Sequence, residues 1–194
     1  MAEPELNLEV LRGREILVGI TGGIAAYKTA MLVSRLVQAG AGASVIMTEH
    51  ATRFVGPLTF QTLTGRPVYT DLFESPEVCH TEHVALAERA DLVVVAPATA
   101  NLLAKLAHGI ADDLLSTVLL AIGVPLLVAP AMNARMWTHP AVQANVETLR
   151  SRGVRFVGPE EGRLACGTVG PGRMAEPPEI LRQMVDILSS RAKA

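Results

Sequence analysis

Near its N-terminus the chain reads Ile16-Leu-Val-Gly-Ile-Thr-Gly-Gly-Ile-Ala-Ala-Tyr-Lys28. The apolar run 16–20 is short and is followed by small residues, which is typical of a buried strand. Beyond Gly22 and Gly23 the pattern becomes helical, and we expect a helix from Ile24 to Gln38. This stretch therefore predicts a strand that turns directly into a helix, as in α/β proteins.

The same alternation continues along the chain. Further short apolar runs bounded by Gly or Pro predict buried strands at Ala43 to Met47, Leu92 to Ala96, Leu126 to Ala129 and Val154 to Val157. Helical patterns predict helices at Leu102 to Leu106, Asp113 to Ile122, Pro140 to Arg152 and Pro178 to Arg191. Strands that are apolar on both faces indicate a doubly wound parallel sheet covered by helices on each side. We therefore predict a three-layer α/β fold, Rossmann-like or flavodoxin-like, in a single domain over residues 1–194 with its core at about 14–192.

The composition excludes several classes of partner. Lys and Arg number 17 against 19 for Asp and Glu, and this net charge of -2 provides no basic surface for nucleic acid or an anionic membrane. Although 49% of the residues are apolar, no stretch reaches the roughly 18 apolar residues that a membrane span needs. The segment 1–14 lacks the features of a secretory signal, so we expect a soluble cytoplasmic protein.

The low charge also predicts self-association. Charged residues make up 19% of the chain, below the roughly 25% of an average domain, which indicates that copies of the chain cover part of its surface. The helix expected at Asp113 to Ile122 is apolar almost all round, and we expect it to lie between subunits. Asp112 precedes this helix and is expected to cap it.

The carboxyl ends of the strands are where a doubly wound sheet binds its ligands. The first strand ends in the turn 21–23, whose small residues let backbone N–H groups approach a phosphate at a helix N-terminus. The second strand ends in Thr48, where a dinucleotide site would place an acidic residue, so a mononucleotide such as FMN is favoured over NAD. A tight turn without a ligand is the alternative. We expect Lys28 to extend into solvent, and Thr99 and Asn101 either to face a ligand or to form a helix cap.

The cysteines and histidines do not form a metal-binding pattern. The cluster Cys79-His80-Thr81-Glu82-His83 has zinc-ligand types, but two of them are adjacent and no second Cys/His pair exists, so no metal is predicted. One histidine of the cluster is a candidate base near neutral pH, and the residues alone do not choose between His80 and His83. Cys79 and Cys166 are expected to be free thiols.

The segment Leu164 to Met174 places glycines and a proline around one cysteine and one arginine. This composition predicts a mobile flap that closes over a substrate, with a floppy surface loop as the alternative. In the closed flap Cys166 would donate a proton and Arg173 would bind an anion.

Together these segments resemble the flavin-dependent cysteine decarboxylases, most closely their bacterial coenzyme A biosynthesis type. The resemblance covers roughly 14–177. It rests on the turn Thr21 to Lys28, on His83 before Asp91, on Pro97-Ala-Thr-Ala-Asn101, on Pro130-Ala-Met-Asn-Ala-Arg-Met-Trp137 and on Ala165-Cys-Gly-Thr-Val-Gly-Pro-Gly-Arg-Met174. The family usually has Ser and Thr where this chain has Thr99 and Leu102, so one hydroxyl contact to the flavin is lost at Leu102.

The resemblance implies the site residues. It names His83 over His80 as the base and keeps Cys166 as the acid. The implied FMN contacts are Gly22, Gly23, Ile24, Thr48, Thr99, Ala100, Asn101, Leu102 and Ala131. The implied substrate contacts are Asn133 for the carboxylate, together with Met136, Arg173 and Met174.

The resemblance also implies a reaction, the decarboxylation of 4′-phosphopantothenoyl-L-cysteine to 4′-phosphopantetheine and CO2. Direct loss of CO2 would leave a carbanion without an electron sink, whereas oxidation by FMN to a thioaldehyde leads to a stabilised ene-thiolate. Reduction and a proton from Cys166 then complete the cycle. Homotrimers or homododecamers are implied, with a phosphopantothenate-cysteine ligase separate or fused. The alternatives are a peptidyl-cysteine decarboxylase of lantibiotic maturation, a flavin prenyltransferase, a non-catalytic FMN-binding regulatory subunit and a bare nucleotide-binding module.

Overall fold

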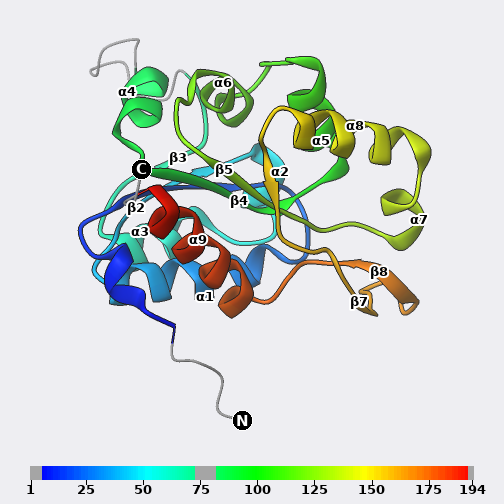
Figure 1. The fold of residues 1–194 in the computed structure, drawn as a ribbon, viewed down its shortest axis with the longest axis horizontal. Coiled ribbons are helices and arrows are strands. Elements are labelled where there is room, and N and C mark those ends of the chain that lie inside the picture. The colour runs from blue at the N-terminus through cyan, green and yellow to red at the C-terminus, as the bar shows by residue number, and fades with distance from the viewer. Residues whose placement is uncertain (1–5, 73–81, 192–194) are drawn as a thin grey trace.

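The computed structural model describes residues 6–72 and 82–191, drawn as a coloured ribbon in Figure 1. Within these ranges no helix is long and apolar enough to cross a membrane. Cys79 and His80 lie outside the described residues.

A six-stranded parallel sheet forms the centre of the molecule, with the strand order β3-β2-β1-β4-β5-β6. The chain fills one half of the sheet outward from β1 and then returns to β4 to fill the other half. This order confirms the predicted doubly wound α/β fold. The strands are β1 (Glu15–Ile20), β2 (Gly42–Met47), β3 (Val68–Tyr69), β4 (Leu92–Ala98), β5 (Leu126–Pro130) and β6 (Arg155–Phe156).

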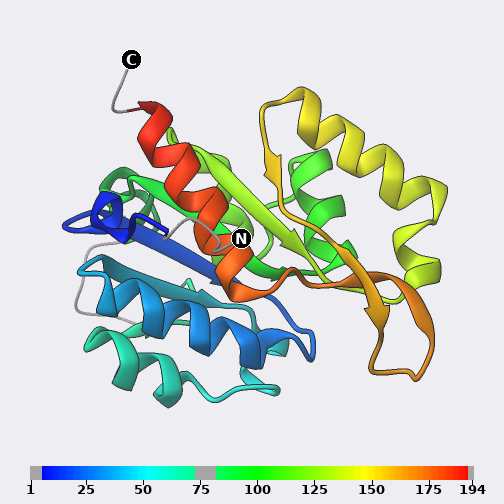
Figure 2. The same ribbon diagram turned by 60° about the horizontal axis from the view of Figure 1, so that its bottom comes forward.

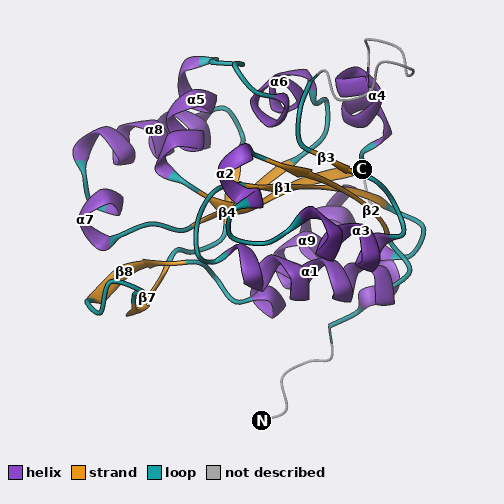
Figure 3. Ribbon diagram, turned by 180° about the vertical axis from the view of Figure 1, so that it is seen from behind, coloured by secondary structure: helices purple, strands orange, loops and turns teal. Residues whose placement is uncertain are grey.

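Helices cover both faces of the sheet, which gives the three layers seen in Figure 3. One face carries α1 (Ala26–Gln38), α3 (Pro57–Thr64) and α9 (Pro177–Arg191), and the other carries α4 (Glu82–Arg89), α5 (Ala100–His108), α6 (Leu114–Ala121) and α8 (Pro140–Ser151). The short helices are η1 (Leu8–Leu11), α2 (Glu49–Thr52) and α7 (Ala134–Trp137). Of these elements, β3, α3, α4 and the short helices were not predicted from the sequence.

The inner strands of the sheet are apolar because each of them faces two cores. All residues of β4 are buried, and alternate side chains enter opposite layers. Val94 packs with the helices α1 and α9, whereas Val93 and Val95 pack with α5, α6 and α8. This double burial explains why continuous apolar runs in the sequence located the sheet.

The helix α6 is apolar because this chain itself buries it. Leu115 and Val118 are buried in the layer shared with α4 and α5, and Leu120 is 52% exposed. The apolar character of 113–122 therefore no longer indicates a contact between subunits, because the core of a single chain accounts for it.

Asp113, and not Asp112, caps α6. The Asp113 carboxylate accepts a hydrogen bond from Ser116 N–H at 2.7 Å, and Ser116 Oγ accepts one from Asp113 N–H at 3.1 Å. Asp112 instead pairs with Lys105, with 2.6 Å between Oδ1 and Nζ. The prediction for Asp112 was wrong because Asp113 is the residue in the extended conformation that an N-cap adopts.

A β-hairpin projects from the carboxyl edge of the sheet. It consists of β7 (Glu160–Arg163) and the antiparallel β8 (Val169–Arg173), and Figure 2 shows it on a stem that leads into α9. The predicted flap 164–174 thus contains the turn and the second strand of this hairpin. Its structure is regular, although its sequence contains few strand-forming residues.

Candidate active site

A cavity of about 720 Å³ lies at the carboxyl ends of β1, β4 and β5 and extends to the hairpin. Its walls come from segments that are far apart in the sequence. They are residues 22–25, 27–28, 99–100, 131–133, 136, 163–167 and 172–174. The cavity therefore lies where a doubly wound sheet is expected to bind a ligand.

Most of the predicted site residues line this one cavity. They are Gly22, Gly23, Ile24, Thr99, Ala100, Ala131, Asn133, Met136, Cys166, Arg173 and Met174. Thr48, Asn101 and Leu102 are not among the lining residues. His83 belongs to the first turn of α4, and its side chain lies outside the described part of the chain.

Thr21 holds the ends of β1 and β4 together beneath the cavity. Its Oγ1 donates to Pro97 O at 2.7 Å and accepts from Thr99 N–H at 3.0 Å. Thr21 is buried, so these bonds also satisfy a hydroxyl that would otherwise be costly to bury. The two strand ends at which the order of the sheet reverses are thereby fixed side by side.

The two glycines of the turn after β1 have different roles. A Cβ at Gly22 would lie 2.4 Å from His50 Cβ, so the approach of α2 excludes any side chain there. A Cβ at Gly23 would have Pro97 Cγ as its nearest neighbour at 3.8 Å, which is an ordinary contact. Gly22 is therefore needed for packing, whereas Gly23 leaves its backbone open to the cavity.

The N-terminus of α5 reaches the cavity through Thr99 and Ala100. Thr99 caps this helix, since its Oγ1 accepts from Leu102 N–H at 3.4 Å, so the cap interpretation of this residue is confirmed. The N–H groups of Ala100 and Asn101 have no acceptor within the helix and are suited to an anion. The Leu102 side chain is buried in the core, so its missing hydroxyl removes nothing from the cavity lining.

Thr48 has a structural role at the end of β2. It caps α2, and its Oγ1 accepts from Ala51 N–H at 3.3 Å. This cap places α2, and with it His50, against Gly22.

Asn133 and Cys166 meet at the edge of the cavity. Asn133 Nδ2 donates to Cys166 Sγ at 3.3 Å, and Asn133 Oδ1 accepts from Arg135 N–H at 2.8 Å as the cap of α7. Because the cap engages the amide oxygen, the amide NH₂ must face the thiol. Both residues were predicted as site residues from the sequence, and the fold brings them into contact.

The environment of Cys166 favours its thiolate. Hydrogen bonds with Thr168 and then Asn133 lower the pKa of the exposed Cys166 thiol below its ordinary value, with 3.1 Å between Sγ and Thr168 Oγ1. A thiol with a lowered pKa is a stronger proton donor, and the thiolate that it leaves is already solvated by these groups.

Glycines of β8 allow the hairpin to dock against the segment that contains Asn133. Met132 N–H donates to Gly172 O at 3.0 Å, and a Cβ at Gly172, whose φ is +142°, would lie 2.2 Å from Met132 O. A Cβ at Gly170 would lie 3.0 Å from Ala134 Cβ. This backbone contact places Cys166 beside Asn133, and only the spacing of the glycines indicated it in the sequence.

Two cations of the cavity are paired with acidic residues. Lys28 Nζ lies 2.7 Å from Glu176 Oε1, and the Lys28 side chain is 12% exposed, so the prediction that it extends into solvent was wrong. Arg173 lies 2.7 Å from Glu160 Oε2. Neither acidic residue was predicted from the sequence, because both pairs depend on the tertiary structure.

The described residues contain no group of His, Cys, Asp or Glu side chains that could hold a metal ion. Tyr27, Met132 and Arg163 also line the cavity, and none of them was predicted as a site residue from the sequence. Tyr27 and Met132 belong to the motifs quoted above, and their positions within those motifs were the available signal.

Comparison with known proteins agrees with this description of a ligand-binding α/β domain. The model of the Flavoprotein family matches residues 5–189, and this chain belongs to that family. Among curated proteins, it is 53% identical over 173 residues to the Coenzyme A biosynthesis bifunctional protein CoaBC of Bacillus subtilis, covering 89% of this chain and 43% of that protein. It is 48% identical over 181 residues to the CoaBC protein of Mycolicibacterium smegmatis, covering 93% of this chain and 43% of that protein. The chain therefore spans less than half the length of these relatives.

Solved structures of similar fold include FMN-dependent and PPC decarboxylases. The FMN-dependent cysteine decarboxylase SpaF has a TM-score of 0.82 and 36% identity, with 94% of this chain and 99% of that chain covered. A PPC decarboxylase mutant complexed with pantothenoylaminoethenethiol has a TM-score of 0.78 and 28% identity, and the match covers 94% of this chain and 100% of that chain.

Proposed function

We propose that this chain is an FMN-dependent decarboxylase that converts 4′-phosphopantothenoyl-L-cysteine to 4′-phosphopantetheine and CO2. The observation that carries the proposal is the contact between Asn133 and Cys166 at one end of a cavity whose other end is the Gly23 turn. The similar proteins support the same choice, since they include CoaBC proteins and a PPC decarboxylase bound to pantothenoylaminoethenethiol.

The residues of the cavity fit FMN. The space beside Gly23 and the N–H groups at the start of α5 suit a phosphate, and Ile24, Met132 and Met136 give the apolar surface that a flavin ring needs. The lining residues Gly22, Thr99, Ala100 and Ala131 complete the proposed contacts to FMN within the cavity. Thr48, Asn101 and Leu102 stay predicted cofactor contacts, although they do not line the cavity. When bound, FMN supplies the reversible oxidation that makes loss of CO2 feasible.

The side chains at the hairpin then bind the substrate and move one proton. The Asn133 amide is held by its cap and offers N–H donors to the substrate carboxylate. Arg173, Met136 and Met174 line the same space. After CO2 has left, Cys166 donates its proton to the substrate carbon, and Thr168 stabilises the thiolate that remains. His83 stays the proposed base of the oxidation step.

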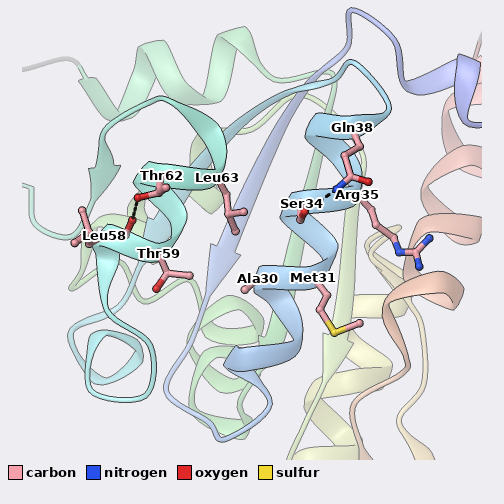
Figure 4. A pocket seen from close by; sticks show the side chains of 9 residues that line it. All are labelled: Ala30, Met31, Ser34, Arg35, Gln38, Leu58, Thr59, Thr62 and Leu63. Atoms are coloured by element: carbon pink, nitrogen blue, oxygen red, sulfur yellow. Dashed lines mark hydrogen bonds between the residues drawn. The ribbon is translucent and has the colours of Figure 1, made fainter.

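The proposed assembly is a homo-oligomer, a trimer or a dodecamer. Support comes from exposed apolar side chains in α1 and in the turn before it, since Ile24, Tyr27 and Met31 are 59%, 56% and 52% exposed. This row leads from the cavity to a groove of about 840 Å³ between α1 and α3, where Leu58 is 71% exposed (Figure 4). A second copy that covers this surface would also shield the cofactor.

A phosphopantothenate-cysteine ligase, fused or separate, is the proposed partner. The curated CoaBC relatives are bifunctional and longer than this chain, which supports a fused ligase. Residues 1–194 are proposed as one flavoprotein domain with its core at about 14–192, and the single sheet shared by both hydrophobic cores supports this. The cytoplasmic location stays a prediction.

The experiment that tests this function is anaerobic incubation of the FMN-loaded protein with phosphopantothenoylcysteine, followed by mass spectrometry. We expect loss of CO2 and a saturated product. Unchanged substrate despite bound FMN would contradict the proposal, and an ene-thiol as the final product would favour the peptidyl-cysteine type of enzyme.

A further inference from the structure

Two acidic side chains outside the cavity each hold one of its cations. Glu160 at the start of β7 pairs with Arg173 at the end of β8, and Glu176 in the connection to α9 pairs with Lys28 of α1. Glu160 and Glu176 are themselves linked, since Glu160 Oε1 accepts from Glu176 N–H at 3.4 Å. One network thus joins the helix after the Gly23 turn to both strands of the hairpin.

The network lies at the stem of the hairpin, where the two strands leave the body of the molecule. Glu160 and Arg173 are direct partners in the register of β7 and β8, and the register shifts at the next residue. Figure 2 shows the hairpin projecting from this stem, away from the body of the sheet. A change of angle at the stem therefore moves the turn that carries Cys166 by a larger distance.

The guanidinium group of Arg173 depends on Glu160 for its position. Its Nε is buried and has no hydrogen-bond partner among the described residues, so Nε does not anchor it. It packs over Gly162, where an added Cβ would lie 3.1 Å from Nε. The ion pair of 2.7 Å with Glu160 is the contact that orients this side chain.

Lys28 depends on Glu176 in a similar way. Its side chain is largely buried, so its ammonium group has lost much of its hydration and needs a nearby negative charge. The carboxylate of Glu176 is 45% exposed, and solvent screens the pair, so the expected contribution is to position more than to stability.

We propose that Glu160 and Glu176 are positioning residues for the Cys166 hairpin. Each holds one cation of the cavity, and together they fix the stem of the hairpin against α1. The consequence for the reaction rests on the proposed function, because it is the placement of Cys166 beside Asn133 that the network preserves.

The test compares Glu160→Ala with Glu161→Ala in the FMN-loaded protein. Glu161 is the matched control, because it is the next residue of β7, carries the same charge and is exposed. Its side chain makes no hydrogen bond or ion pair with residues of the described ranges.

The readout is the rate at which iodoacetamide alkylates Cys166 across a range of pH, followed by peptide mass spectrometry to separate it from Cys79. The midpoint of this profile reports the hydrogen bonds to Sγ, of which the one from Thr168 lies within the hairpin turn and the one from Asn133 depends on where the hairpin lies. The charged side chains that share the cavity with Cys166 are Lys28, Arg163 and Arg173.

We expect Glu160→Ala to move the midpoint to higher pH, because the thiol loses its contact with Asn133. Loss of a negative charge alone would move the midpoint the other way, so the sign separates the two effects. Glu161→Ala should show no upward shift. In an Asn133→Ala background, Glu160→Ala should no longer raise the midpoint, because the contact that it disturbs is already absent.

An unchanged or lowered midpoint in Glu160→Ala would overturn the proposal, as would an equal upward shift in Glu161→Ala. Glu160→Gln keeps an oxygen acceptor for Arg173 and should give a smaller upward shift. If Glu160→Ala does not fold, Glu160→Gln and Glu176→Gln carry the same test.

A second readout uses phosphopantothenoylcysteine. We expect Glu160→Ala to release a larger fraction of ene-thiol than the parent, because Cys166 delivers its proton less often. If the parent protein does not release CO2, the proposed function fails, while the alkylation midpoint still decides the role of the network.

Discussion

The two ends of β1 are built in opposite ways. At the amino end, charged side chains close the sheet, since Glu15 pairs with Arg66 and Arg14 pairs with Asp91. At the carboxyl end, Gly22 and Gly23 have no side chains, and their backbone lines the cavity. The amino end is thus fitted to stabilise the sheet, whereas the carboxyl end is fitted to hold a ligand. Variants at the two ends should therefore separate activity from stability.

The largest effect is expected at the carboxyl end for Gly172→Ala. The new Cβ would meet Met132 O, and φ at this position is unfavourable for alanine, so the hairpin must move away from Asn133. A displacement of about 1 Å at a catalytic group costs roughly 100-fold in rate, and we expect at least that loss of turnover. The measurement is kcat for phosphopantothenoylcysteine, together with thermal unfolding.

The control for this prediction is Pro171→Ala in the same strand. It adds no atoms toward the segment 132–134, so its turnover should stay near that of the parent. Equal activity of Gly172→Ala and the parent would show that the close approach of the hairpin is not needed for catalysis.

A smaller effect is expected from Gly22→Ala. Its Cβ would overlap with His50, and overpacking of this kind lowers the free energy of unfolding by roughly 1–3 kcal/mol. Gly23→Ala is the matched variant, because the nearest atom to its Cβ is Pro97 Cγ at 3.8 Å, which is an ordinary contact.

These two variants separate packing from ligand binding at adjacent glycines. Gly23→Ala should leave the stability of the apoprotein nearly unchanged and weaken FMN binding, measured by the recovery of flavin fluorescence on release. Gly22→Ala should lower the unfolding temperature even without FMN. Equal loss of apoprotein stability in both would show that the two glycines do not differ as described.

The same contrast explains how much the sequence predicted. The sheet was predictable because strands such as β4 are buried on both faces and are therefore continuously apolar. The hairpin was not predicted, because Glu160–Arg163 has no apolar pattern and becomes a strand only by pairing with β8. Its regular structure depends on distant contacts, such as that between Gly172 and Met132.

For the site, residue types were predictable and pairings were not. Asn133 and Cys166 were both named from their motifs, and the contact between them required the fold. Lys28 and Glu176 are 148 residues apart, so neither position indicated an ion pair, and the sequence alone favoured a lysine in solvent. Asp112 and Asp113 differ by one position, which the sequence pattern does not resolve at a helix end.

The smallest effect is expected at the amino end of β1, for Glu15→Gln. The hydrogen bond from Arg66 lowers the pKa of the Glu15 carboxyl in the folded protein. The charged carboxylate therefore stabilises the fold fully above the unfolded pKa, which is near 4.5. This contribution is lost as the pH falls through the lower, folded pKa. The pair is about one-third exposed, and after allowance for solvent screening we expect a loss of about 1 kcal/mol at pH 7. Urea unfolding at pH 7 and below pH 4 should show that the difference in stability between Glu15→Gln and the parent becomes smaller in acid. The rate of decarboxylation should be unchanged, because Glu15 lies at the end of β1 opposite the cavity. Arg12→Gln removes an exposed pair with Glu9 and should change neither quantity. An equal loss in both variants would mean that the Glu15 contact contributes no more to stability than an exposed surface pair.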